Sequence, residues 1–358
     1  MDYLTNHEII LAARRAASGP VWDYICGGSE SETTMRRNRL GLDSLAFRPR
    51  VLCDVSHIDT ATSLLGLPSR LPVFLAPMAS LQLMTPDAAL AADGAAEDCG
   101  IVSVLSGHTP PGIEEVAANS PHGKIYQIYV RGGRAWLEEL LGRVRAAGYR
   151  ALAVTVDTAV YSNRERQMMA GWEPPTRRSN ADGREFLAGL TWDDWDMIAE
   201  IWGGLMIIKG VDTAADARRA VAHGAACIYV SNHGGRQLDH NRATIAALPE
   251  VVDAVGDSAE VWIDGGFVRG TDIVKAIALG ARAVGIGKLQ AWALTAGGRQ
   301  ALVNCLQILD AEIRSCMGLL GVTALDQLGA RHLARARPVA PAHEMSAFPH
   351  LPRGGRLT

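Results

Sequence analysis

The segment SNHGGRQLD, residues 231–239, combines side chains that can bind an anion and remove a proton. A neutral imidazole such as that of His233 accepts a proton, and the guanidinium of Arg236 can form two parallel hydrogen bonds with a carboxylate. The two glycines between them carry no side chain and let a ligand approach the backbone. A lone histidine is more often a satisfied core residue, but these neighbours predict a general base beside a carboxylate-binding arginine.

Eight short apolar runs must position these side chains, and they alternate with alanine-rich segments that begin with Thr or Asp and end with Gly, as helix caps require. Continuous β-branched runs are typical of strands buried on both faces of a parallel sheet. Eight strand–helix units predict a single (β/α)8 TIM barrel. An open doubly wound sheet is disfavoured because no GxGxxG turn occurs. The runs are 71–79, 101–106, 124–130, 151–157, 205–210, 226–232, 260–266 and 283–288.

Polar and ionisable side chains stand where the apolar runs end. TIM barrels form their active sites at the C-terminal ends of the strands, so we expect these side chains to converge on one mouth. Asp157 is the candidate that orients the His233 imidazole and raises its basicity. The strand-end residues are Pro77, Met78, Ala79, Ser106, Gln127, Tyr129, Thr155, Asp157, Lys209, Ser231, Asn232, His233, Asp264, Gly265, Gly266, Gly287 and Lys288.

Six motifs occur in an order that resembles one enzyme family over nearly the whole chain. They are WDYICGG, YQIYV, TVDT followed by Arg164-Glu165, IKG, SNHGGRQLD and DGG. Together they resemble the FMN-dependent α-hydroxy acid oxidases and dehydrogenases, a family that includes glycolate oxidase, lactate oxidase and mandelate dehydrogenase. The resemblance implies FMN as cofactor and oxidation of an (S)-2-hydroxy acid, a small molecule, to the 2-oxo acid.

The resemblance also implies roles for individual residues around the substrate. Arg236 is the main carboxylate clamp, Tyr24 and Arg164 are further carboxylate contacts, and Tyr129 bonds the hydroxyl or the developing oxo group. His233 is the base, supported by Asp157. His108 stands where glycolate oxidase has a bulky aromatic residue, so the pocket wall differs and glycolate is not assumed to be the substrate.

For the cofactor, the resemblance implies that Lys209 lies against the pyrimidine edge of the flavin, where a fixed cation stabilises the charge of the reduced ring. Backbone and polar groups would hold the ring, the ribityl chain and the phosphate. This set is Pro77, Met78, Ala79, Ser106, Gln127, Thr155, Ser231, Asp264, Gly265, Gly266, Arg269, Gly287 and Lys288.

Two cofactor positions depart from the family pattern. Family members commonly have DGGxRRG after the seventh strand and Gly-Arg after the eighth, whereas this chain has DGGFVRG and Gly287-Lys288. Val268 replaces one phosphate-binding arginine, which leaves Arg269 and Lys288 as candidates. Lysine binds phosphate as a point charge without the guanidinium fork. The usual His-Pro-x-Gly pattern after the first strand is Thr85-Pro86-Asp87-Ala88 here.

The whole chain, residues 1–358, is expected to form one domain. Residues 1–70 would cap the barrel, 71–290 would carry its strands, and 291–358 would form the last helix and a C-terminal extension. A long segment after the fourth strand contains Pro174-Pro175 and a tryptophan-rich helical pattern. Long loops of this kind are often active-site lids.

Composition limits the partners and the compartment. A formal net charge of -3 provides no basic surface for nucleic acid. The sequence contains no run of about 18 apolar residues, so no membrane span is predicted. The first residues do not resemble a signal peptide. The six scattered cysteines show no metal-ligand spacing, so no metal is expected and a cytoplasmic location is favoured. The resemblance implies a homo-oligomer, a tetramer or an octamer.

Other functions remain open on the sequence alone. Ala79 at the flavin face resembles the oxidases of the family rather than the mandelate dehydrogenase pattern. The resemblance therefore implies oxygen as the electron acceptor, and a dehydrogenase using another acceptor is the alternative. An FMN barrel with isomerase-like chemistry on a diphosphate is disfavoured by the His233–Arg236 combination. A flavin-binding barrel without turnover is the third possibility.

Overall fold

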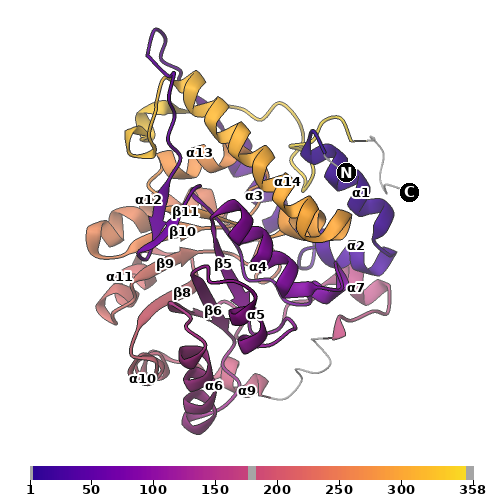
Figure 1. Cartoon of the computed structure of the whole chain (residues 1–358), viewed down its shortest axis with the longest axis vertical. Helices are drawn as coiled ribbons and strands as arrows, with labels where there is room; N and C mark the ends of the chain where they lie inside the picture. The colour runs from indigo at the N-terminus through magenta and orange to yellow at the C-terminus, as the bar shows by residue number, and fades with distance from the viewer. Residues whose placement is uncertain (1–2, 176–182, 352–358) are drawn as a thin grey trace.

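The computed structural model describes residues 3–175 and 183–351 and contains a closed barrel of eight parallel strands (Figure 1). Neighbouring strands follow one another in chain order, and β11 pairs with β4 to close the ring. All eight apolar runs form barrel strands, so the predicted TIM barrel is confirmed. The strands are β4 (Val73–Leu75), β5 (Val102–Ser106), β6 (Lys124–Ile128), β7 (Ala151–Thr155), β8 (Leu205–Val211), β9 (Cys227–Val230), β10 (Glu260–Ile263) and β11 (Ala283–Ile286).

Helices connect successive strands and cover the outside of the barrel (Figure 1). Their ends follow the predicted capping chemistry: the Thr213 side chain accepts a hydrogen bond from the backbone N–H of Asp216, and Gly100 ends a helix with φ +62°. The last helix begins directly after β11, so that Lys288 is its first residue. The helices are α4 (Ala88–Cys99), α5 (Ile113–Asn119), α6 (Arg134–Ala146), α11 (Ala214–Ala222), α12 (Thr244–Val255), α13 (Gly270–Ala278) and α14 (Lys288–Leu320).

The segment after β7 contains α7 (Glu165–Met169), α9 (Arg184–Ala188) and α10 (Trp192–Trp202). The tryptophan-rich pattern therefore forms the expected helix, which begins with a capping box between Thr191 and Asp194. Part of the expected lid, residues 176–182, lies outside the described residues.

A hairpin of β2 (Thr62–Leu64) and β3 (Leu67–Ser69) contributes to the core at the start of the barrel strands. Leu64 and Leu65 at its tip belong to one buried cluster with barrel residues such as Phe74 and Trp262. The backbone N–H of Leu65 donates to Glu260 Oε1, at the first residue of β10, over 2.9 Å. The hairpin thus packs into the end of the barrel opposite to the strands' C-termini.

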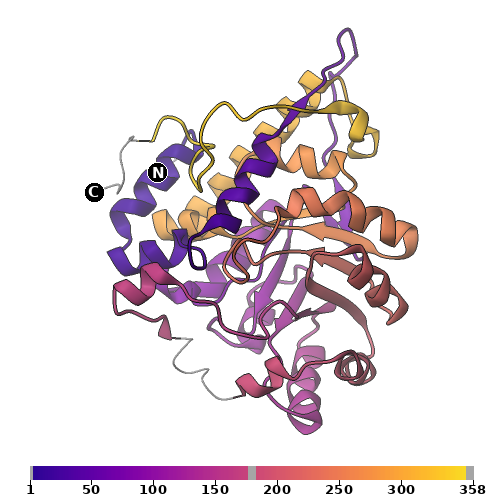
Figure 2. The same ribbon diagram turned by 180° about the vertical axis from the view of Figure 1, so that it is seen from behind.

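Three helices precede the barrel: α1 (Asn6–Ala16), α2 (Gly19–Cys26) and α3 (Thr33–Asp43). Helix α1 packs along α14 (Figure 1), and β1 (Leu45–Phe47) pairs with β12 (Leu333–Arg335) near the other end of the chain. In Figure 2 the yellow C-terminal segment runs from β12 past α3 to the N-terminal helices. Short 3-10 helices lie at Leu81–Leu83, Gly256–Ser258, Leu325–Gln327 and Ala330–His332. Among the helices of the described residues, none is long and apolar enough to span a membrane.

Candidate active site

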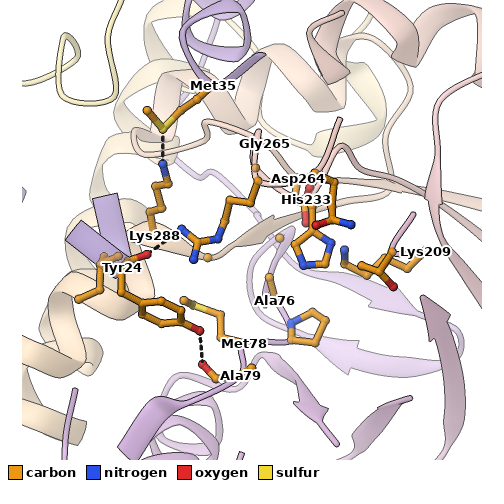
Figure 3. Close-up of a pocket in the computed structure, with 18 of the residues that line it drawn as sticks. Tyr24, Met35, Ala76, Met78, Ala79, Lys209, His233, Asp264, Gly265 and Lys288 are labelled. Carbon is orange, nitrogen blue, oxygen red and sulfur yellow. Dashed lines mark hydrogen bonds between the residues drawn. The ribbon is translucent and has the colours of Figure 1, made fainter. Parts of the chain in front are cut away.

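One cavity opens at the C-terminal ends of the barrel strands, and the sequence-predicted residues gather around it (Figure 3). Helices α2 and α3 of the N-terminal segment supply another part of the wall. The predicted residues that line it are Tyr24, Pro77, Met78, Ala79, His108, Tyr129, Arg164, Lys209, His233, Arg236, Asp264, Gly265, Gly266, Gly287 and Lys288.

His233 and Asp157 meet although they follow different strands. His233 Nδ1 lies 3.1 and 3.2 Å from the two carboxylate oxygens of Asp157. The missing side chain at Gly210 leaves room for Asp157, because a Cβ there would lie 2.6 Å from the Cβ of Asp157. The bond to Asp157 leaves Nε2 as the ring nitrogen available for a proton.

Burial and neighbouring charges set the protonation of this pair. Burial lowers the pKa of His233 below 6.5, Asp157 opposes the shift, and Lys209 adds to it. Burial would raise the pKa of Asp157, but His233 and Lys209 hold it below its ordinary value. At neutral pH the site therefore contains a neutral imidazole oriented by a carboxylate, which is the form that accepts a proton.

Arg236 is anchored by the end of helix α2. Its Nη1 donates to the carbonyl oxygens of Tyr24 and Gly27 over 2.7 and 2.8 Å, and its guanidinium lies 5.0 Å from the Tyr24 ring centre. Both protons of Nη1 are thereby used, and the edge formed by Nε and Nη2 is the one left to meet a carboxylate.

A second arginine lies close to Arg236. Burial and the charge of Arg164 lower the pKa of Arg236 to about 10. The Nε of Arg164 is buried and has no hydrogen-bond partner. Two like charges held together in a buried wall are stabilised by an anion between them, so this part of the cavity is suited to a carboxylate.

Tyr129 and His108 also line the cavity. Their rings stack with centres 4.5 Å apart, and burial raises the pKa of Tyr129 far above its ordinary value. Tyr129 therefore remains a hydrogen-bond donor throughout the working range of pH. Burial, with the charge of Arg131, lowers the pKa of His108 to about 3, so His108 is neutral. The Tyr24 hydroxyl donates to the Ala79 carbonyl over 3.2 Å (Figure 3).

Lys209 is held by a buried polar network. Its Nζ donates to Ser231 Oγ over 3.2 Å, and Ser231 in turn donates to Asp264 Oδ1 over 2.7 Å. Asp264 Oδ2 accepts from the Tyr229 hydroxyl over 2.8 Å. The network fixes a cation at the floor of the cavity, with only 3% of Lys209 exposed.

The comparisons with known proteins identify the family. A model of the family described as FMN-dependent dehydrogenase matches residues 13–335. The chain belongs to this family.

Individual members of the FMN-dependent dehydrogenase family match the chain over almost its full length. It is 37% identical to Glycolate oxidase 1 of Zea mays, over 98% of this chain and 99% of the relative. It is also 37% identical to L-lactate oxidase of Nostoc sp., over 88% and 94%. The crystal structure of a mandelate oxidase with (S)-2-phenylpropionate superposes with a TM-score of 0.87 at 33% identity, covering 94% of this chain and 100% of that one.

The cavity of this FMN-dependent dehydrogenase fits the ring of its cofactor. Lys209 places a fixed cation in its wall, where the reduced ring gains negative charge. Behind the wall, Gln127 is 0% exposed and donates to Thr155 Oγ1 over 2.8 Å, and its Oε1 is buried without a partner. Bound FMN would lie against Lys209. Five of the expected residues do not line the cavity and lie behind its wall: Ser106, Gln127, Thr155, Asp157 and Ser231.

The phosphate end differs from the expectation for Arg269. Its guanidinium pairs with Glu312 on α14 over 2.7 Å and lies over the Phe348 ring, and Arg269 does not line the cavity. The ion pair with Glu312 thus holds Arg269 away from the cavity lining, and its contact with the phosphate stays a prediction. Lys288 does line the cavity, and its Nζ donates to the Cys26 carbonyl over 2.8 Å and contacts Met35 (Figure 3).

Several lining residues were not expected from the sequence. Met35, Asn38 and Arg39 come from α3, Trp292 comes from α14, and Glu344 comes from the C-terminal segment. They do not follow barrel strands, and nothing in their spacing distinguishes them from other residues of helices or irregular segments. The sequence prediction considered only the C-terminal ends of the strands, so it could not identify them.

Replacing Lys288 by alanine should weaken FMN binding about 10- to 100-fold, because a charge-assisted phosphate contact contributes roughly 1.5 to 3 kcal/mol. Riboflavin, which has no phosphate, should bind almost unchanged. Val268→Arg, which restores a charge to the cavity wall, should slow the loss of FMN on dialysis. Flavin fluorescence titrations measure all three, and an unchanged FMN affinity in Lys288→Ala would remove the end of β11 from the phosphate site.

Proposed function

We propose that this protein oxidises an (S)-2-hydroxy acid to the 2-oxo acid and passes the electrons to oxygen. The observation that carries the proposal is the His233–Asp157 pair, 3.1 Å apart, whose histidine lines one cavity with Arg164 and Arg236. Relatives named as glycolate, lactate and mandelate oxidases support both the substrate class and the acceptor.

Each side chain has a defined task in this reaction. Arg236 and Arg164 bind the carboxylate, with the Tyr24 hydroxyl as a third contact, and so fix the α-carbon in front of the flavin. Tyr129 donates to the substrate oxygen, and His233 accepts the proton released there. Bound FMN supplies the two-electron acceptor. Lys209 places a positive charge next to the ring that becomes more negative.

The cavity around His108 bears on the size of the substrate. Imidazole is smaller than the bulky aromatic group of glycolate oxidase, and Val160, Pro174 and Leu187 line the same cavity. His108 is neutral, and Arg131, whose charge acts on it, lines the cavity as well. We propose that hydroxy acids with a larger side chain are better substrates than glycolate.

An anaerobic reduction screen tests the function. Glycolate, lactate, mandelate and longer-chain 2-hydroxy acids are mixed with the FMN-loaded protein without oxygen, and flavin absorbance is followed. We expect bleaching by at least one acid and recovery of the absorbance with hydrogen peroxide when oxygen is admitted. Bleaching without recovery in oxygen would indicate a dehydrogenase with another acceptor, and no bleaching by any acid would contradict the proposal in favour of an isomerase-like or non-catalytic flavin barrel.

The pH dependence of kcat/KM reports the ionisation of the free enzyme. We expect kcat/KM to decrease as the pH falls through a pKa below 6.5, because only neutral His233 accepts a proton. It should decrease again at about pH 10, where Arg236 loses the charge that binds the carboxylate. Steady-state kinetics from pH 4.5 to 10.5 measure both limbs, and an acid limb centred above pH 7 would contradict the assignment of His233.

Compartment and assembly are separate parts of the proposal. We propose a cytoplasmic location, which the six unpaired cysteines support because reducing conditions keep thiols free. We also propose a homo-oligomer, a tetramer or an octamer, on the resemblance to the family. Size-exclusion chromatography with light scattering determines the assembly.

A further inference from the structure

The C-terminal segment brings an acidic side chain to the cofactor cavity. After β12 the chain passes α3 (Figure 2). Glu344 of this segment lines the same cavity as Val268 and Lys288. Phe348 anchors this part of the segment: it is 2% exposed and meets the rings of Trp292 and His7 with centres 6.4 and 5.2 Å away. The carboxylate is therefore carried by a packed segment.

Glu344 is ionised and belongs to a buried group of charges. It pairs with Arg166 over 3.3 Å, and Arg166 also pairs with Glu32. Burial would raise the pKa of Glu344, but Lys288 and Arg166 hold it below its ordinary value. Glu344 also acts on Lys288. Burial and the charge of Arg236 lower the pKa of Lys288 to about 8, and the charge of Glu344 opposes this shift. Glu344 and Lys288 thus interact electrostatically in this cavity.

The charge at this end of the cavity is unusual for a phosphate site. Val268, 4% exposed, stands where the family pattern has an arginine, and Arg269 is paired with Glu312 outside the cavity. Arg39 also lines the cavity, but its charge is paired with Asp272 and Asp43. The positive charge expected at position 268 is missing, and Glu344 adds a negative charge to the lining. A phosphate group carries nearly two negative charges at neutral pH, so a neighbouring carboxylate opposes its binding.

We propose that Glu344 sets the affinity for FMN by opposing the cofactor's phosphate. The protein then holds FMN exchangeably, because a carboxylate in the cavity wall repels the phosphate. The proposal rests on FMN as the cofactor and does not depend on which hydroxy acid is oxidised.

A structural role for Glu344 would give the opposite result. If the carboxylate only fastened the C-terminal segment to Arg166, its removal would loosen the wall of the cavity and weaken both FMN and riboflavin. If it opposes the phosphate, removing its charge strengthens FMN alone. The sign of the change in FMN affinity, compared with riboflavin, separates the two roles.

The test compares Glu344→Gln and Glu344→Ala with the unchanged protein. Release of FMN from the loaded protein is followed on dilution by flavin fluorescence, and riboflavin is titrated into the dialysed protein. We expect both variants to bind FMN about 3- to 30-fold more tightly at low salt, with a smaller gain at high salt and little change for riboflavin. Glu32→Gln is the matched control, since Glu32 shares Arg166 but does not line the cavity, and its effect should be smaller.

Two outcomes would overturn the proposal. One is an FMN affinity that is unchanged or weaker in both Glu344 variants. The other is an equal gain for FMN and riboflavin, which would assign the effect to the shape of the cavity. Thermal unfolding of each variant without flavin shows whether it is folded, and if Glu344→Ala is not, Glu344→Gln decides.

Discussion

Replacing His233 by asparagine should slow the reduction of bound FMN by a 2-hydroxy acid about 10²- to 10⁴-fold, because general-base catalysis typically contributes this much. Asparagine suits the position, since His233 has φ +58° and asparagine tolerates the left-handed region better than alanine does. FMN should remain bound in both His233→Asn and His233→Ala. Stopped-flow absorbance under anaerobic conditions measures the reduction rate directly.

A second histidine provides the control for this experiment. His223 Nδ1 lies 2.7 Å from Asp196 Oδ1, and this His–Asp pair does not line the cavity. His223→Asn should reduce FMN at the unchanged rate. If His233→Asn also reduced FMN at the unchanged rate, His233 would have no part in the reaction, and the base would have to be sought elsewhere in the cavity.

Replacing Arg236 by lysine should lower kcat/KM about 30- to 1000-fold although the charge is kept. Lysine has no planar fork to meet the carboxylate, and each lost charge-assisted hydrogen bond contributes roughly 1.5 to 3 kcal/mol. It also cannot hold both carbonyls of the α2 end in the geometry that Arg236 uses. Steady-state kinetics with the best acid of the reduction screen measure the loss.

The control and a matched substrate complete this test. Arg242 lies in the same loop but pairs with Asp212 and Glu250, so Arg242→Lys should keep its kcat/KM within a few-fold. An alcohol of the same size as the acid but without the carboxylate should be a poor substrate of the unchanged protein. Equal turnover of acid and alcohol would show that no carboxylate clamp operates.

The barrel was predictable because its strands have no polar face. Each run is buried on both sides, so the sequence shows an uninterrupted apolar segment that stops where the chain reaches the mouth. The location of the active site was predictable for the same reason, because ionisable residues at the C-terminal ends of the barrel strands lie around one mouth. His233 and Asp157, which lie 76 residues apart, could be paired on that ground alone.

Features that depend on precise packing could not be predicted in the same way. Arg269 follows the seventh barrel strand closely in the sequence. Glu312, the carboxylate with which it forms an ion pair, is on α14 and far along the chain. Glu344 reaches the cavity through an irregular segment with no periodic pattern. The close approach of Asp157 to Gly210 depends on the packing of two different strands, and no pattern in the sequence marks it.

Helix α2 ends in carbonyl oxygens that accept from two cations with different tasks: Tyr24 and Gly27 accept from Arg236, and Cys26 accepts from Lys288. A displacement of this helix end moves the carboxylate clamp and the phosphate cation together. Thermodynamic linkage would make such an effect reciprocal, so a carboxylate bound at Arg236 and a phosphate bound at Lys288 would then alter each other's dissociation constants. The end of helix α2 is thus the place where a change in substrate binding would reach the cofactor.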